Sequence, residues 1–237
     1  MFASTTQSPV LLLGAAHVVD LEEPLRRELS SRTLDGVAIE LDAERAAALF
    51  ASSGGGSGRG APLFARLWGL VQRRLGAEIG SGEPGAEMKV AAQLAKERNL
   101  PLFLIDDPIR ATLLELVRTM PFKERVTLLA GAVLALFVPA KVVEREMDRY
   151  AEAPADYTSE LRRASPTLAR VLLDERNEHM ADRLAVLRSR GYGRMAVVVG
   201  DAHLVGLGAA LGRRGVPVEA IPFQRLRGAT APSSTPS

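Results

Sequence analysis

An uninterrupted apolar segment near the carboxyl end of the chain, residues 195–199, restricts the possible folds most strongly. Its sequence is MAVVV, and polar residues do not alternate with the apolar ones. Such a segment suits a strand that is buried on both faces, as in a parallel sheet covered by helices. Gly200 ends the segment, and His203 follows in a Gly-x-x-His sequence before a helix expected over residues 205–211. The pattern indicates an α/β fold.

The same arrangement occurs near the amino end of the chain. Residues 10–13 are VLLL, Gly14 ends this second apolar segment, and His17 follows at the same spacing before a helix expected over residues 21–29. The chain contains 3 histidines, and two of them lie in these Gly-x-x-His sequences. Ligands of open α/β sheets bind at the carboxyl ends of the strands. We therefore expect both imidazoles at one edge of the sheet.

Three further short apolar segments, 37–41, 102–105 and 218–221, complete the set of predicted strands. Between the strand at 102–105 and the strand at 195–199 the sequence is helical in character almost throughout, from about 109 to 190. Strands that alternate with helices favour a parallel sheet. We predict a mostly parallel central sheet of about five strands with flanking helices and a large helical block between the third and fourth strands.

The domain organisation follows from the same pattern. Residues 1–228 are predicted to form a single α/β domain into which the helical block is inserted. Residues 229–237 contain only small residues, Thr and Pro, and are predicted to form a disordered tail.

Composition excludes several classes of protein. The formal net charge is only +2, and the basic residues are scattered pairs without interleaved aromatic residues, so nucleic-acid binding is not expected. The absence of cysteine excludes disulfides and thiolate chemistry and fits a reducing compartment, so a cytoplasmic location is expected. The amino end lacks the features of a secretory signal.

The longest apolar run, residues 128–140, contains 13 residues, whereas a membrane-spanning helix needs roughly 20. We predict a buried helix here and no stable transmembrane segment. Peripheral contact with a membrane is the alternative, and it predicts solubility that depends on detergent.

Polar side chains that ionise or bind metals follow four of the predicted strands: His17, Glu40, Asp106 and His203. Two imidazoles and a carboxylate suit a divalent ion such as Zn, Mn, Co or Fe, and they leave positions open for water. We predict a metal site formed by His17, His203 and Glu40. A water molecule on such an ion is acidified and can act as the nucleophile in hydrolysis.

Each of these residues also has a purely structural interpretation. A histidine at a strand end is often a structural residue, and Glu40 can cap the helix expected over 42–50. Asp106 before Pro108 is ordinary turn chemistry. Glu175 and His179, four residues apart on one predicted helix, are compatible with a metal pair but are more typical of a solvated face. The argument for a site depends on the coincidence of these groups at one edge of the sheet.

Several motifs in order resemble the TraB/PrgY/GumN family, which is similar to the Tiki proteases. They are GAAH at 14–17, VAIELDAER at 37–45, the segment 85–113, DERNEHMADRL at 174–184 and VVVGDAHLVGL at 197–207. The resemblance implies that His17 and His203 are the two Gly-x-x-His histidines. It also implies functional roles for Glu40 with Arg45, for Glu87 of the Gly-x-Glu motif, and for Glu175 with Arg176.

One departure from the family pattern affects the expected substrate. The Asp-Arg-Pro that usually follows the third strand is Asp106-Asp107-Pro108 here, so an acidic residue replaces a basic one. The membrane segments that follow the domain in some relatives are not found in this sequence.

The expected function is a metal-dependent hydrolase, a peptidase that acts on small or extended peptides or another small-molecule substrate. In this hypothesis Glu40 or Glu87 completes the metal site, and Arg45 and Arg176 orient a carboxylate or stabilise an oxyanion. The alternative is a regulatory protein that binds a peptide or haem in the same pocket without chemistry. Fold alone does not decide between them.

Overall fold

The computed structural model of the protein describes residues 8–15, 21–51, 85–135 and 154–228, together with 142 and 145. His17 and the tail expected over 229–237 lie outside these residues, as does the 136–140 part of the longest apolar run.

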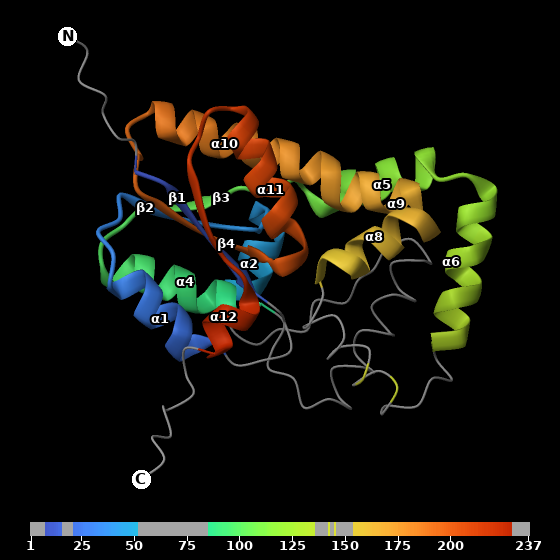
Figure 1. The fold of residues 1–237 in the computed structure, drawn as a ribbon, viewed down its shortest axis with the longest axis horizontal. Coiled ribbons are helices and arrows are strands. Elements are labelled where there is room, and N and C mark those ends of the chain that lie inside the picture. The colour runs from blue at the N-terminus through green and yellow to red at the C-terminus, as the bar shows by residue number, and fades with distance from the viewer. Residues whose placement is uncertain are drawn as a thin grey trace.

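Within the described residues, one sheet of five parallel strands forms the centre of the molecule (Figure 1). The spatial order of the strands is β3-β2-β4-β1-β5, and every neighbouring pair is parallel. The predicted α/β fold with a mostly parallel sheet is thus confirmed. The strands are β1 (Val10–Ala15), β2 (Gly36–Ile39), β3 (Leu102–Leu104), β4 (Met195–Gly200) and β5 (Val218–Ile221).

The strands that precede the two Gly-x-x-His sequences are direct neighbours in the sheet. In the pairing of β1 with β4, Gly14 lies opposite Val199 and Ala15 lies opposite Gly200. The first five residues of each strand are buried, in agreement with the absence of polar alternation in their sequences.

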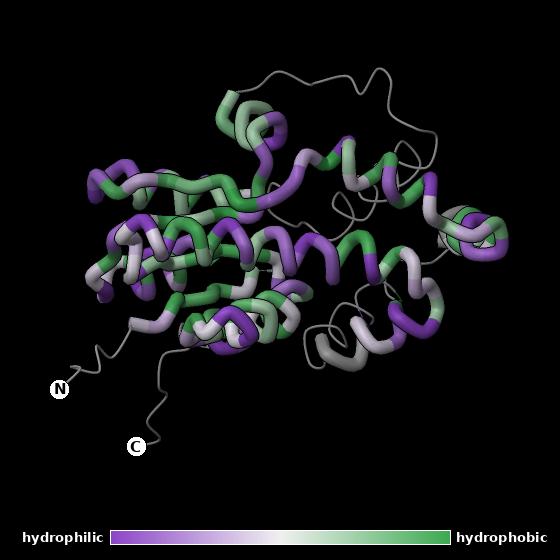
Figure 2. The backbone as a smooth tube through the Cα atoms, turned by 90° about the horizontal axis from the view of Figure 1, so that it is seen from above, coloured by the Kyte–Doolittle hydropathy of each residue, from purple (hydrophilic) through white to green (hydrophobic). Residues whose placement is uncertain are grey.

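Alternate residues of each strand enter two separate hydrophobic layers. Leu11 and Leu13 of β1 pack in the layer formed with helices α1, α2, α4 and α12. Leu12 of the same strand packs in the layer formed with α10 and α11. Figure 1 shows α1, α4 and α12 on one side of the sheet and α10 on the other, and Figure 2 shows the hydrophobic colour along the strands between them. These helices are α1 (Glu22–Ser30), α2 (Ala43–Phe50), α4 (Ala86–Glu97), α10 (Glu175–Ser189), α11 (Asp201–Arg213) and α12 (Phe223–Gly228).

The predicted helical block lies between β3 and β4 in the sequence, and Figure 1 shows most of it beside the layered part of the molecule. A short π-helical segment, η1, connects α9 to α10, so that the chain continues as one helical rod into α10. The described elements of the block are α5 (Ile109–Thr119), α6 (Phe122–Ala135), α8 (Pro154–Ala164), α9 (Pro166–Ala169) and η1 (Arg170–Asp174).

The prediction of a buried helix over 128–140 is wrong for the part that the structure describes. Leu129 is 49% exposed, and Val126 and Phe122, about one and two turns earlier on α6, are also exposed. The apolar residues of α6 are spread around the helix instead of forming one stripe, so no single face could bury all of them. Within the described residues, no helix combines the length and apolar character that a membrane crossing requires.

Helix α11 begins earlier than its sequence predicts, at Asp201 instead of Val205. An acidic residue is favourable in the first turn of a helix, and the Asp201 carboxylate also accepts a hydrogen bond from the backbone N–H of Phe223 (2.9 Å). His203 therefore lies in the first turn of α11, immediately after the carboxyl end of β4.

Candidate functional site

Glu40 is the first residue after β2, at the carboxyl edge of the sheet. Its Oε2 accepts a hydrogen bond from the backbone N–H of Gly200 at the end of the neighbouring strand β4 (2.7 Å). The side chain is only 11% exposed. The parallel pairing of β2 with β4 thus places a carboxylate beside the first turn of α11, where His203 lies.

Arg176, at the start of α10, joins the polar groups of this edge. Its Nη2 donates to Glu40 Oε1 (2.5 Å). Its Nε and Nη2 donate to the two oxygens of Asp106 (2.9 and 2.5 Å), which is the bidentate geometry that guanidinium and carboxylate groups favour. Nη1 donates to the carbonyl oxygen of Leu172 (3.1 Å). One arginine thus connects the ends of β2 and β3 with the helical block.

A second arginine, Arg45, reaches the same cluster from α2. It bonds to Asp106 Oδ2 and, through Nε, to Asp42 Oδ2 (2.7 Å). Asp42 caps α2 by accepting the backbone N–H groups of Glu44 and Arg45, which explains why this helix begins directly after Glu40 and Leu41. The Arg45 side chain is 30% exposed, whereas that of Arg176 is 11% exposed. Arg45 is therefore the guanidinium that a bound molecule reaches more easily.

The imidazole of His203 is buried and contacts polar groups through both ring nitrogens. Nδ1 lies 2.9 Å from Asn177 Oδ1, which can only accept, so Nδ1 carries a proton. Nε2 lies 3.2 Å from Arg176 Nη1 and 3.3 Å from Glu40 Oε1. A neutral ring accepts at Nε2 from the arginine, and a protonated ring donates at Nε2 to the carboxylate. The surroundings can therefore accommodate both protonation states.

The charges of the cluster explain which groups ionise. Burial by itself would raise the pKa of Glu40. The opposing effects of His203, Arg176 and the Gly200 N–H are together larger, so the pKa lies well below its usual range. Burial would lower the pKa of Arg176, but its hydrogen bonds and ion pairs with Asp106 and Glu40 raise it above its usual range. Both groups therefore stay charged at neutral pH.

Three carboxylates of the cluster, Glu40, Asp42 and Asp106, face two guanidinium groups. Among the described residues the cluster is thus short of one positive charge. A proton on His203 or a bound cation can supply that charge.

The structure places the residues predicted from the sequence as follows. Hydrogen bonds and ion pairs connect four of them, directly or through Asp106: Glu40, Arg45, Arg176 and His203. Glu87 is buried in the first turn of α4, which begins next to Leu49 of α2. Its predicted role stays a prediction, as does that of His17.

Two of the predicted residues point to other partners. Glu175 precedes Arg176 but pairs with the exposed Arg170. His179 contacts the carboxylate of Asp107, which also accepts from Arg183 Nη2 (2.8 Å). The acidic residue that replaces the arginine of the family motif therefore binds Arg183 and His179 of α10.

Asn177 and Asp42 are site residues that sequence reasoning missed. Asp42 precedes a helix with polar residues two and three positions later, and this pattern marks it as a cap. Asn177 carries no such signal, because its contact with His203 depends on how α10 and α11 pack.

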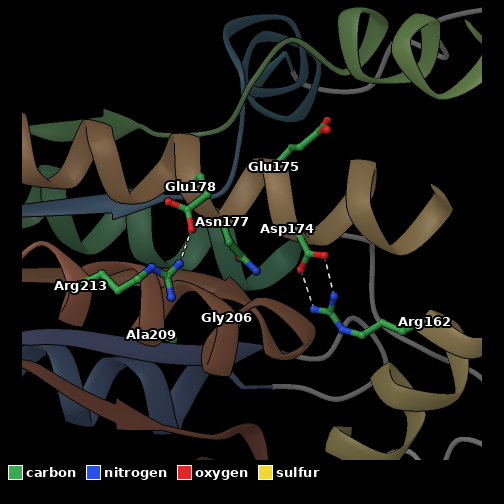
Figure 3. Close-up of a pocket in the computed structure, with 8 residues that line it drawn as sticks. All are labelled: Arg162, Asp174, Glu175, Asn177, Glu178, Gly206, Ala209 and Arg213. Atoms are coloured by element: carbon green, nitrogen blue, oxygen red, sulfur yellow. Dashed lines mark hydrogen bonds and ion pairs between the residues drawn. The ribbon is translucent and has the colours of Figure 1, made fainter. Parts of the chain in front are cut away.

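The amide of Asn177 also lines a cavity of about 380 Å³ between α10 and α11 (Figure 3). Figure 3 shows Asn177 directed toward Gly206, with Arg162 facing Asp174 and Arg213 facing Glu178, while Glu175 points away. Arg162 and Asp174 form two hydrogen bonds (2.5 and 2.6 Å). Glu40, Arg176 and His203 do not line this cavity, so it lies behind the site and borders it only through Asn177.

The described residues do not by themselves fit a divalent ion. His203 Nε2 and Glu40 Oε1 are 3.3 Å apart, a separation that two ligands of one ion can have, but both atoms contact the guanidinium of Arg176. Catalytic zinc sites use three protein ligands. No group of three metal-binding side chains forms among the residues that the structure describes. The prediction of a metal ion therefore stays a prediction that depends on His17.

Replacing Gly206 by alanine is expected to destabilise the protein, because a Cβ at this position would lie 2.2 Å from Asn177 Nδ2. Overpacking of this kind costs about 1–3 kcal/mol. Urea unfolding of both proteins measures the difference. Gly208→Ala in the same helix is the control, since its Cβ would meet its neighbours at 3.9 Å and the substitution should be neutral or stabilising. Equal stabilities of the two variants would contradict the close packing of Asn177 against α11.

The fold and the cluster define an α/β protein with a buried site of carboxylates, arginines and one histidine at the carboxyl edge of a parallel sheet. The chain belongs to the TraB/PrgY/gumN family, whose family model matches residues 3–220.

An uncharacterized protein of Methanocaldococcus jannaschii is 30% identical to the chain over 217 residues, which cover 87% of the chain and 54% of the relative. The chain thus spans about half the length of the curated relative that it matches.

Proposed function

We propose that the protein is a hydrolase that acts on peptides at the site formed by Glu40, Arg45, Arg176 and His203. The observation that carries the proposal is the setting of His203. One ring nitrogen is fixed by Asn177, and the other lies against a carboxylate that stays ionised and an arginine that stays charged. Such a histidine can take a proton from an attacking water and hold it next to the carboxylate.

The roles of the other residues follow from their positions. Glu40 accepts hydrogen bonds from Arg176 and Gly200 and stabilises the imidazolium when the proton has been transferred. Arg176 holds Glu40 and Asp106 in place. Arg45 is the more exposed cation, so it is suited to orient a substrate carboxylate or to stabilise an oxyanion. Glu87 is proposed to complete the site from α4.

Peptides are the proposed substrate class because the family resemblance implies peptide cleavage. The divalent ion predicted from the sequence is the proposed cofactor, and it would be held by His17, His203 and Glu40. With the ion bound, His203 Nε2 would be a ligand instead of the proton acceptor, and the ion would supply the acidification of the attacking water.

We expect protein purified without chelators to cleave members of a quenched-fluorescence peptide library, and we expect elemental analysis to find a divalent ion. His17→Ala should lower both the metal content and the rate of cleavage. His179→Ala is the matched control, since this exposed histidine should change neither quantity.

The possible results separate the parts of the proposal. Cleavage that persists without metal and in the presence of a chelator would contradict the cofactor but not the hydrolase. Absence of cleavage from metal-loaded protein would contradict the hydrolase, and peptide or haem binding without turnover would favour the regulatory alternative.

A further inference from the structure

A second cavity, of about 400 Å³, runs along the edge of the sheet next to the site. Residues 102–105, which form β3 and its end, line one side of this edge groove, and residues of the last turns of α10 together with Arg190, which follows the helix, line the other. The side chains of β3 are half-buried. Val186 of α10 is 48% exposed. The groove thus has apolar walls that are open to solvent.

Some backbone hydrogen-bonding groups of β3 point away from the sheet and have no backbone partner among the residues that the structure describes. β3 is the outermost strand on its side, and its only neighbour among the described strands is β2. Ile105 N donates to Ile39 O (3.2 Å), and Val37 N donates to Pro101 O (3.0 Å). Because backbone groups alternate in direction along a strand, the N–H and C=O groups of Leu102 and Leu104 point outward. An edge of this kind is a template for an additional strand.

Charged groups on the rim of the groove favour an acidic occupant. Arg190 is exposed and has no acidic partner among the described residues. Arg183 is 41% exposed and bonds to Asp107. The rim residue of opposite charge, Asp182, is paired with Arg214 (2.7 Å). The rim therefore offers the guanidinium of Arg190 to a carboxylate, with the ion-paired Arg183 beside it.

The groove leads directly to the site. β3 continues through Ile105 into Asp106, whose carboxylate binds Arg176 and Arg45. Arg183 of the rim donates to the backbone carbonyl of Asp106. A chain bound along β3 would thus have one end at the carboxyl edge of the sheet.

We propose that the edge groove binds an extended acidic peptide, which adds a strand to the sheet beside β3. Backbone hydrogen bonds to Leu102 and Leu104 supply affinity for any extended sequence, and Arg190 selects a carboxylate. One part of this proposal rests on the proposed function, namely that the bound peptide is the substrate that the neighbouring site hydrolyses.

The test uses fluorescein-labelled octapeptides of alternating Val and Thr, with one Asp placed at each position in turn. Binding to the full chain is measured by fluorescence anisotropy. Leu104→Pro should weaken binding of the best peptide at least tenfold, because it removes an outward N–H, while β3 keeps its bonds to β2. Arg190→Glu should weaken binding of the acidic peptides and not of the all-neutral parent. Arg163→Glu, an exposed arginine of α8, is the matched control.

A second measurement needs no protein variant. The best peptide is made in two forms, N-methylated at alternate residues in the odd or in the even positions. An added strand directs only one of these sets of N–H groups to β3, so one form should lose at least tenfold in affinity and the other should bind nearly as the parent does.

Equal effects of the two methylation patterns, or no binding of any octapeptide, would overturn the inference. Binding that follows the expected pattern in a protein without hydrolytic activity would support the groove and contradict the hydrolase, so the two failures are distinguishable.

Discussion

Replacement of His203 by alanine is expected to lower the rate of peptide hydrolysis by about 10²- to 10⁴-fold, the usual contribution of a positioned general acid or base. The substitution removes the imidazole whose Nε2 lies against the Glu40 carboxylate and the Arg176 guanidinium, and these two groups stay charged and cannot take its place. Steady-state hydrolysis of the best library peptide measures the effect.

The control must separate catalysis from stability, because the imidazole is buried and Asn177 Oδ1 would lose its partner. A buried polar group left without a partner costs about 1–3 kcal/mol. His203→Ala should therefore still be folded by circular dichroism at the assay temperature, and His179→Ala should keep the wild-type rate. A folded His203→Ala protein with unchanged activity would rule out the proposed role.

Replacement of Arg176 by methionine should have the largest effect on stability, about 3–5 kcal/mol, because it removes the guanidinium that the buried carboxylates of Glu40 and Asp106 share and leaves Asp106 with Arg45 alone. Glu40 would lose a hydrogen bond of 2.5 Å, and Asp106 would lose both bonds of a bidentate pair. The measurement is urea unfolding at pH 7. Arg213→Met is the control, since its exposed ion pair with Glu178 should contribute at most about 1 kcal/mol.

The stability difference between wild type and Arg176→Met should depend on pH. The pKa of Glu40 is lower in the folded protein than in the unfolded chain, so its contribution is present above the ordinary value of about 4.3 and is lost as the pH falls below it. In the variant this contribution is already reduced. The unfolding free energies of the two proteins should therefore converge in acid. A constant difference from pH 7 to pH 3 would show that Arg176→Met destabilises the protein through lost packing instead of lost charge pairing.

The sheet was predictable because its strands carry strong local signals. The segments at 10–13 and 195–199 are apolar without interruption, and such strands must be covered on both faces, as they are in a parallel sheet between two helical layers. The order of the strands was not predictable, because it depends on contacts between residues far apart in the sequence. The exposed face of α6 also had no local signal, since an apolar composition does not specify what covers a helix.

Part of the candidate site followed from topology alone. Glu40 and His203 both come after strands of a parallel sheet, so they had to lie at the same edge, and the structure brings them within 3.3 Å. Arg176 was suggested only by the family resemblance, because it lies on a helix far from any strand end. Its contact with Asp106 arises from the packing of α10 over the sheet, which no spacing within the sequence encodes.

The π-helical segment η1 ends immediately before the helix that carries Arg176. Such a segment holds one residue more per turn than an ordinary helix, and each residue of an α-helix turns the chain by about 100°. Everything that precedes η1 in the rod is therefore rotated by that amount relative to Arg176. An insertion or deletion of one residue in this rod would turn α9 about the helix axis relative to Arg176. The number of residues in η1 therefore fixes the direction in which α9 faces relative to the site.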